Sequence, residues 1–100
     1  MKRSQGTSGD KRGVFAISVA ADMVSMQIQN LRVYERRGLV DPDRTSGGMR
    51  LYSPDDIDRL HRIRELSAEG LNLAGIARVL ALEERVRLLE ARLRKRRGTQ

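Results

Sequence analysis

Apolar positions in the first quarter of the chain occur in short groups separated by turn-forming residues. The segment VFAI at 14–17 favours one short strand. Ser18 is predicted to cap a helix through VAADMV at 19–24, and SMQ at 25–27 then interrupts the apolar pattern. Residues 1–13 are polar and rich in Gly, Ser and charge, so they are expected to form a disordered basic arm.

A helical spacing of apolar residues resumes after this break. Ile28, Leu31 and Tyr34 share one face of a helix expected over 28–37, and Gly38 stands where such a helix ends. The next segment contains a DPDR turn and then two short strand-like stretches on either side of a Gly-Gly pair, which predict a β-hairpin.

The second half of the chain reads as two further helices. Ser53 is predicted to cap the first of them, with Pro54 at its first position and Asp56 completing a capping box. Gly70 ends this helix and Asn72 caps the next. The residues expected to form the buried stripe of the first are Ile57, Leu60, Ile63 and Leu66. Leu71 and Ile76 are placed as a hydrophobic staple at the start of the second.

The last helix is predicted to run from residue 72 to about residue 97, because nothing breaks its pattern. Its apolar residues follow spacings of three and four, which is the a/d pattern of a coiled coil. The predicted dimer-interface residues are Val79, Leu82, Val86, Leu89 and Leu93. The alternative is that this stripe packs on its own domain, but the helix is long for so small a domain.

Composition narrows the possible partners. Hydrophobic residues make up 39% and aromatic residues 3% of 100 residues, so a thin aliphatic core is expected. The net charge of +7 favours a polyanion, most often nucleic acid, with an anionic membrane surface as the alternative. There is no Cys, no spanning apolar run and no secretory signal pattern, so a cytoplasmic protein is expected.

Two short helices joined by a tight break, the second with a polar and basic outer face, form the pattern of a helix-turn-helix. The hairpin that follows is then a wing. Gln and Asn can bind adenine through two hydrogen bonds and Arg can bind guanine, so base contacts are predicted for this helix. The predicted DNA-binding residues are Gln27, Gln29, Asn30, Arg32, Val33, Arg36, Arg37, Arg44, Arg50 and Tyr52. For Tyr52, core packing with a hydroxyl that reaches outward is the first interpretation and a phosphate contact is the alternative. The basic face could also be merely solvated.

Two motifs carry a resemblance to a known family. LRVYERRGLVDP at 31–42 and RTSGGMRLYSPDDIDRL at 44–60 resemble the MerR family pattern. The matching residues are Leu31, Arg32, Tyr34, Glu35, Gly38, Leu39, Arg44, Gly48, Arg50 and Tyr52. ISVAADM and EGLNLAGIARVLALE further resemble the HspR heat-shock repressor branch, and the resemblance covers residues 14–84.

The resemblance implies a mainly α fold, in which residues 14–71 form a winged helix-turn-helix with a small β-hairpin wing. Residues 72–97 would form the dimerisation coiled coil, antiparallel by the same resemblance, with 98–100 as a tail. It also implies a homodimer that binds an inverted repeat in promoter DNA. It further implies repression of stress or chaperone genes, with an Hsp70-type chaperone as possible co-repressor.

Other functions remain open at this point. One is a small MerR-like developmental or architectural DNA-binding protein, and another is a basic protein-interaction module. An enzyme is not predicted, because the sequence has no nucleophile–base set, metal cluster or phosphate loop. No metal, cofactor or small-molecule effector is expected: Asp55 and Asp56 stand at a helix N-terminus, and His61 has no Cys or second His beside it.

Overall fold

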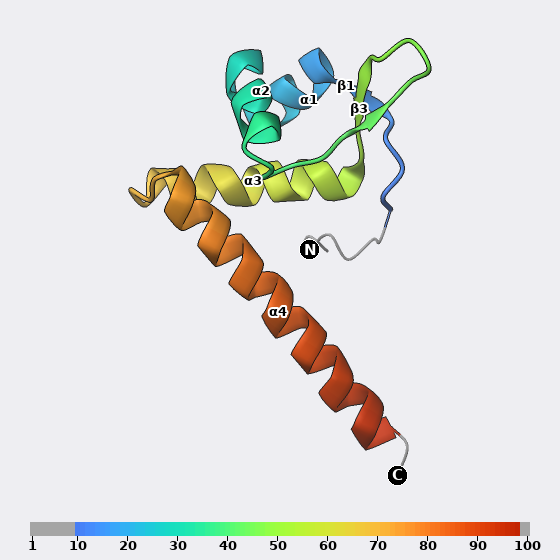
Figure 1. The fold of residues 1–100 in the computed structure, drawn as a ribbon, viewed down its shortest axis with the longest axis vertical. Helices are drawn as coiled ribbons and strands as arrows, with labels where there is room; N and C mark the ends of the chain where they lie inside the picture. Colours follow the sequence, from blue (N-terminus) through green and yellow to red (C-terminus); the bar gives the residue numbers. More distant parts are fainter. Residues whose placement is uncertain (1–9, 99–100) are drawn as a thin grey trace. The chain divides into compact units, whose positions relative to one another are not determined.

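The computed structural model describes residues 10–98, and the chain divides after Glu65 into two compact units. The fold is mainly helical with a small antiparallel sheet, as predicted (Figure 1). In chain order, its elements are β1 (Phe15–Ala16), α1 (Ile17–Val24), α2 (Ile28–Arg36), β2 (Asp43–Arg44), β3 (Arg50–Tyr52), α3 (Pro54–Ala68) and α4 (Leu73–Gly98).

The start of α1 differs from the prediction. The helix begins at Ile17 with Ala16 as its N-cap, and no side chain caps it. Ser18 therefore lies inside the first turn and is not the cap. The physical reason is the pairing of β1, which holds the chain extended as far as Ala16, so the helix starts directly from the strand.

The predicted hairpin is present, and it is part of a larger sheet. β3 is the central strand of three, and it pairs antiparallel with β1 on one side and β2 on the other. Phe15 lies opposite Tyr52, and Asp43 lies opposite Leu51. The sequence predicted the first strand but did not assign it a partner, because the two segments are far apart along the chain.

The first unit, which ends at Glu65, contains an aliphatic core with two tyrosines. Its buried apolar side chains are Ala20, Ala21, Val24, Leu31, Tyr34, Leu39, Val40, Tyr52, Ile57, Leu60 and Ile63. They come from α1, α2, β3, α3 and the segment that follows α2. The predicted core faces of α2 and α3 are confirmed, except that Ile28 is only half-buried.

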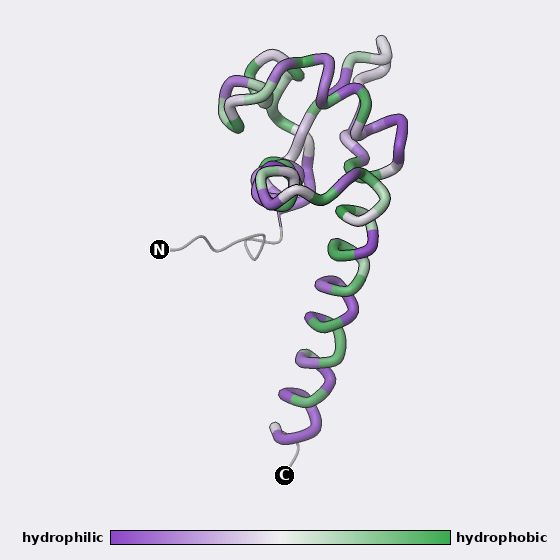
Figure 2. Tube along the Cα trace, turned by 90° about the vertical axis from the view of Figure 1, so that its left-hand side faces the viewer, coloured by the Kyte–Doolittle hydropathy of each residue, from purple (hydrophilic) through white to green (hydrophobic). Residues whose placement is uncertain are grey.

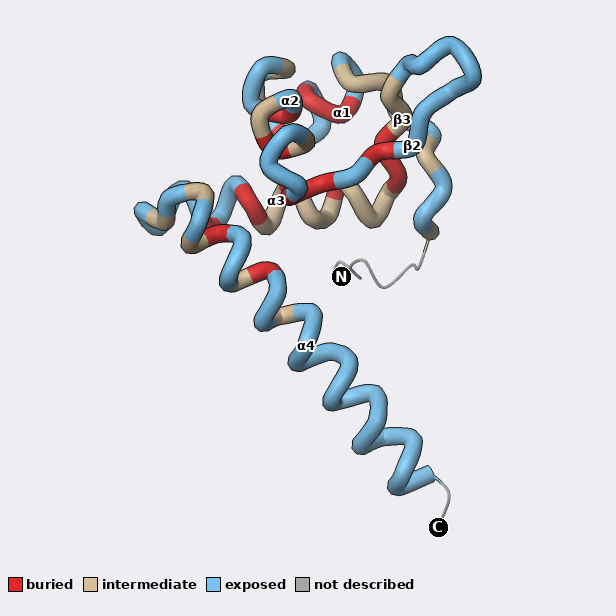
Figure 3. Tube along the Cα trace, viewed as in Figure 1, coloured by how far each residue is buried: buried red, intermediate tan, exposed pale blue. Residues whose placement is uncertain are grey.

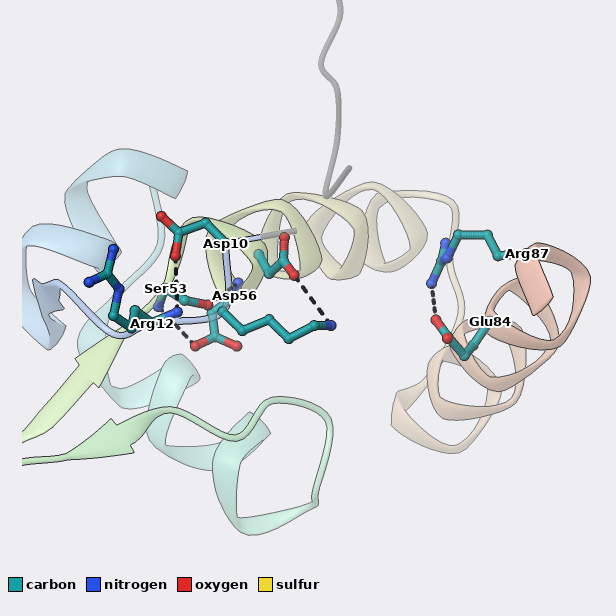
Figure 4. Close-up of polar contacts among 8 residues, drawn as sticks. Asp10, Arg12, Ser53, Asp56, Glu84 and Arg87 are labelled. Atoms are coloured by element: carbon teal, nitrogen blue, oxygen red, sulfur yellow. Dashed lines mark hydrogen bonds and ion pairs between the residues drawn. The ribbon is translucent and has the colours of Figure 1, made fainter. Parts of the chain in front are cut away.

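The predicted capping box at the start of α3 is confirmed. The backbone N–H of Asp56 donates to Ser53 Oγ, and the backbone N–H of Ser53 donates to Asp56 Oδ2, both at 2.9 Å (Figure 4). Burial raises the pKa of Asp56, and the hydrogen bonds from Ser53 partly offset that effect. These reciprocal bonds satisfy backbone groups that a helix start would otherwise leave without partners.

The second unit consists of the end of α3, a short connection and α4. Gly70 has φ +98°, and Asn72 Oδ1 accepts the backbone N–H of Gly75 at 2.8 Å, so the predicted stop and cap are confirmed. Ile76 and Leu80 are buried. Apolar and polar residues alternate along the rest of α4 (Figure 2), and almost all of it is exposed (Figure 3).

Candidate nucleic-acid interface

The outer face of α2 is polar, basic and open to solvent. Leu31 and Tyr34 point into the core, being 0% and 8% exposed, so helical geometry turns the intervening residues outward. The predicted contact residues that are exposed here are Gln27, Gln29, Asn30, Arg32, Arg36 and Arg37. Val33 is only half-buried, so it lies at the border between this face and the core.

The turn between α1 and α2 is tight and fixed. Ser25 adopts a left-handed conformation with φ +56°, which is uncommon for a residue other than glycine. The backbone N–H of Met26 donates to the carbonyl of Ala21 at 3.0 Å, and the N–H of Ser25 donates to that of Asp22 at 3.2 Å. These bonds hold two short helices at the break that the sequence predicted between residues 25 and 27.

The wing is closed by a compact turn. The backbone N–H of Thr45 donates to the carbonyl of Met49 at 2.9 Å, and the N–H of Gly48 donates to that of Thr45 at 2.8 Å. Gly48 has φ +87°, a conformation that a residue with a side chain rarely adopts. Met49 is 61% exposed at this turn, so the wing presents an apolar side chain as well as its basic ones.

Glu35 of α2 ties the wing to the helix. Its Oε2 accepts Arg44 Nη2 at 2.5 Å, and its Oε1 accepts Nε of Arg50. Arg44 also donates through Nη1 to the carbonyl of Gly48 at 3.0 Å. One carboxylate therefore binds an arginine from each strand of the wing. Phosphate contacts by Arg44 and Arg50 stay a prediction, and their pairing with Glu35 gives them a positioning role in addition.

The ionisation of Glu35 reflects this pairing. Burial alone would raise the pKa of its carboxyl, but the hydrogen bonds and charges of Arg50 and Arg44 outweigh burial, so the pKa lies below its ordinary value. The same bond raises the pKa of Arg50. Glu35 matches a position of the family motif, and no role was predicted for it from the sequence. The available signal was a lone acidic residue on an otherwise basic helix.

Tyr52 is not available for the predicted DNA contact. Its side chain is 0% exposed, and its hydroxyl is buried with no hydrogen-bond partner among the described residues. Burial and the neighbouring Glu35 carboxylate raise the pKa of this hydroxyl. Side chains alternate along β3, so Tyr52 lies on the same face of the strand as Arg50 and opposite to Leu51. It packs in the core, which corrects its assignment to the interface.

Part of the predicted disordered arm is ordered. Residues 1–9 lie outside the described residues, but residues 10–13 contact the sheet and the start of α3. The backbone N–H of Gly13 donates to Asp43 Oδ2 at 2.9 Å, and Lys11 Nζ lies 3.6 Å from Asp55 Oδ2. The backbone N–H of Arg12 donates to Asp10 Oδ1 at 3.1 Å (Figure 4). The prediction failed here because composition does not reveal contacts with residues distant in sequence.

Within residues 10–98, no group of three or more His, Cys, Asp or Glu side chains could hold a metal ion. In that same part of the chain, no helix is long and apolar enough to cross a bilayer.

The chain belongs to the MerR family. The sequence pattern described as "MerR HTH family regulatory protein" matches residues 15–83. This match covers both helices of the helix-turn-helix, the wing, α3 and the first part of α4.

Individual relatives agree with the family assignment. The chain is 51% identical over 80 residues to a heat shock protein HspR of Streptomyces coelicolor, covering 79% of this chain and 53% of that one. It is 41% identical over 71 residues to the HTH-type transcriptional regulator GlnR of Bacillus anthracis, covering 71% and 55%. The chain thus spans about half the length of these curated relatives.

A solved structure supports the same fold. HiNmlR, described as a MerR family regulator lacking the sensor domain and bound to promoter DNA, superposes with a TM-score of 0.61 at 25% identity. The alignment covers 80% of this chain and 67% of HiNmlR.

Proposed function

We propose that this protein is a sequence-specific DNA-binding regulator of transcription. The observation that carries the proposal is the exposed face of α2 with the wing fastened beside it by Glu35. A helix of this size fits the major groove of B-DNA, and a wing held at a fixed place beside it adds a second contact. The net charge of +7 supplies attraction to phosphates.

Two copies would bind an inverted repeat. The exposed apolar side chains of α4 support a dimer, because Leu82, Val86, Leu89 and Leu93 are 61%, 50%, 44% and 52% exposed in the single chain. Solvent-exposed apolar stripes at heptad spacing are normally covered by another helix. The two winged helix-turn-helix domains, or heads, of such a dimer are related by a two-fold axis, so they would bind two half-sites of opposite direction.

The target genes are proposed to be stress or chaperone genes, and the effect on them is proposed to be repression. The support is the 51% identity to the Streptomyces coelicolor relative, whose name identifies a heat shock protein. An Hsp70-type chaperone is the proposed co-repressor, as the resemblance to the HspR branch implies. Operator binding by the purified protein, measured with and without that chaperone and across a temperature ramp and a panel of metals, tests this regulation. Release by a metal alone would contradict it.

The first experiment selects bound DNA from a random pool and measures affinity for the selected site. Gln29→Ala and Asn30→Ala are expected to relax preference at one base position each, with a cost of about 1–3 kcal/mol. Arg36→Ala is expected to weaken all sequences alike if it binds a phosphate, and to reduce the salt slope by about one unit. Arg64→Ala, an exposed arginine on α3, is the matched control.

The second experiment tests the dimer. Leu89→Asp places a charge in the exposed stripe and is expected to give monomers in sedimentation. Operator affinity should then fall steeply while non-specific binding is retained, because each head alone reads only one half-site. In the first experiment, α2 does not read the sequence if the Gln29→Ala and Asn30→Ala variants prefer the same bases as the wild type. A footprint that extends with protein concentration would instead favour an architectural role.

A further inference from the structure

Positive charge is distributed unevenly along the chain. Residues 10–65, the described part of the first unit, carry ten basic and nine acidic side chains, a net charge of +1. The short segment 92–97, which we call the basic end of α4, carries five basic side chains and no acidic one. Most of the net charge of +7 therefore lies outside the helix-turn-helix and its wing.

Some of the charge of the first unit is also neutralised within it. Glu35 pairs with both wing arginines, Arg44 and Arg50. Half or more of the hydrogen bonds that proteins make to DNA go to phosphates and sugars, and non-specific binding depends almost entirely on basic groups at phosphates. A nearly neutral reading unit can select bases through α2, but it supplies little of this sequence-independent attraction.

The basic end of α4 is helical and exposed on all sides. α4 runs to Gly98, and all of residues 92–97 are exposed (Figure 3). Successive residues of a helix are turned by about 100° around its axis, so the four basic side chains of 94–97 point in four directions. Such a ring of cations has no single face with which to read bases. It can contact phosphates in any rotational setting of the helix.

The helix dipole accounts for only part of this charge. The C-terminus of a helix carries about half a negative charge, which favours cations in the last turn. Arg92 and Arg96 are four residues apart, and Arg94 and Arg97 are three apart, so like charges stand at the spacings where helical side chains are neighbours. Such pairs destabilise a helix, and a bound polyanion would neutralise them.

We infer that the basic end of α4 binds the phosphates of DNA, as a sequence-independent contact separate from α2 and the wing. The inference rests on the proposed function and extends it. α2 and the wing select the site, whereas the basic end of α4 supplies much of the salt-dependent affinity for any duplex. It also favours association with DNA of any sequence before the site is found.

An anionic membrane surface is the other polyanion that a basic helix can bind. A helix that lies on a bilayer inserts an apolar face beside its basic one. The apolar stripe of α4 ends at Leu93, and residues 94–97 include no apolar side chain. The stripe itself is the surface proposed to pair with a second copy. DNA is therefore the polyanion that this segment fits better.

Two double variants of the full chain separate the position of the charge from its amount. R94Q/R97Q neutralises two arginines of the basic end, and R64Q/R78Q neutralises two exposed arginines elsewhere. Affinity is measured over a range of salt concentrations, for the selected site and for an unrelated duplex of equal length. R94Q/R97Q is expected to weaken both by a similar factor, about tenfold at low salt, and to reduce both salt slopes by about one to two units per chain. R64Q/R78Q should leave both slopes nearly unchanged.

A charge-retaining variant shows whether charge alone is required. R94K/R97K is expected to bind both duplexes as the wild type does, because a phosphate contact without fixed geometry does not need the planar arginine fork. Base preference, measured by selection from a random pool, should be the same in the wild type and in all three variants, since none of them changes α2.

The outcomes distinguish this inference from the proposed function. An unchanged salt slope in R94Q/R97Q, with the wild type still selecting its site, would overturn the inference and leave the proposed function standing. A loss confined to the selected site would overturn it as well, because phosphate contacts act on all sequences alike. A wild type without base preference, whose binding still weakens in R94Q/R97Q, would overturn the proposed function and support the phosphate contact.

Vesicles of phosphatidylserine and phosphatidylcholine test the membrane alternative at the same salt concentrations. The wild type is expected to remain in solution when the vesicles are sedimented. Binding to vesicles that is lost in R94Q/R97Q, together with an unchanged salt slope on DNA, would assign the basic end of α4 to a membrane surface and overturn the inference.

Discussion

The unit up to Glu65 and the outer part of α4 use apolar residues at similar spacing with opposite outcomes. In α3, the stripe residues Ile57, Leu60 and Ile63 are at most 6% exposed, whereas in α4 Leu82 is 61% exposed. Spacing alone does not distinguish the two stripes, since both follow the period of a helix. The difference shows that the first unit buries its own core, whereas the outer part of α4 carries an exposed apolar stripe, the surface proposed above to pair with a second copy.

The polar contacts differ in the same way. In the first unit, Glu35 joins α2 to both strands of the wing, and Asp43 binds the backbone of Gly13, so side chains distant in sequence fix the site. In α4 the ion pair between Glu84 and Arg87 is local, three residues apart. An ion pair within one turn of a helix stabilises that helix only, whereas the contacts of Glu35 fix the position of the β2–β3 hairpin relative to α2.

The largest expected effect on stability comes from truncating a core side chain of the first unit, compared with the same truncation in the exposed stripe of α4. Leu31→Ala removes a 0%-exposed side chain from the first unit and is expected to lower the free energy of unfolding by about 2–5 kcal/mol. Leu82→Ala, the same change at an exposed position, is expected to matter only through association. Urea unfolding at several protein concentrations checks this: only the Leu82→Ala effect should grow with concentration. Equal, concentration-independent losses would contradict the comparison.

Gly13→Ala tests whether the end of the N-terminal arm is packed tightly against the first unit. A Cβ at this position would lie 2.3 Å from the carbonyl oxygen of Leu51, which is backbone and cannot simply move aside. The expected loss of stability is about 1–3 kcal/mol, as for other overpacked sites. Gly47→Ala, whose Cβ would have 3.9 Å to its nearest neighbour, is the control and should be nearly neutral. Thermal unfolding of both variants measures the difference.

Glu35→Gln tests the carboxylate that holds the wing. The variant is expected to lose about 1–2 kcal/mol at neutral pH, because two arginines lose a charged acceptor. The pKa of Glu35 is lowered in the folded protein, so its contribution is present above the ordinary glutamate pKa and is lost as pH falls through the folded value.

The pH dependence supplies the control for this prediction. Unfolding of wild type and Glu35→Gln by urea, repeated from pH 7 downward, should show the two stabilities converging in acid. A difference that stays constant across that range would mean that the charge of Glu35 does not hold the wing. Affinity for DNA at pH 7 should fall as well, since the wing would no longer be fixed beside α2.

The smallest effect is expected for Tyr52→Phe. The hydroxyl of Tyr52 is buried without a partner among residues 10–98, so its removal is expected to leave stability unchanged or to raise it by up to about 1 kcal/mol. DNA affinity should not change, because the side chain is 0% exposed. A clear loss of affinity in a gel shift, with stability retained, would return Tyr52 to the interface.

The sequence by itself determined the features that depend on neighbours along the chain. Gly38 and Gly70 ended helices, and Ser53 and Asn72 capped them, because these signals act within one helical turn. The period of the apolar residues placed the core faces of α2 and α3 and, with them, the outward face proposed to read DNA. Ser18 was wrong as a cap because a strand distant in sequence decided where α1 begins.

Only the tertiary structure decided the contacts between distant segments. It paired β1 with β3, bound Gly13 to Asp43 across thirty positions, buried Tyr52 and gave Glu35 its two arginines. No local rule predicts these, because each needs the folded chain to bring two segments together and exclude water between them. The physical reason is the same for the fold and for the site. Local propensities determine the helices, strands and turns, and the burial of apolar surface determines which of their side chains come into contact.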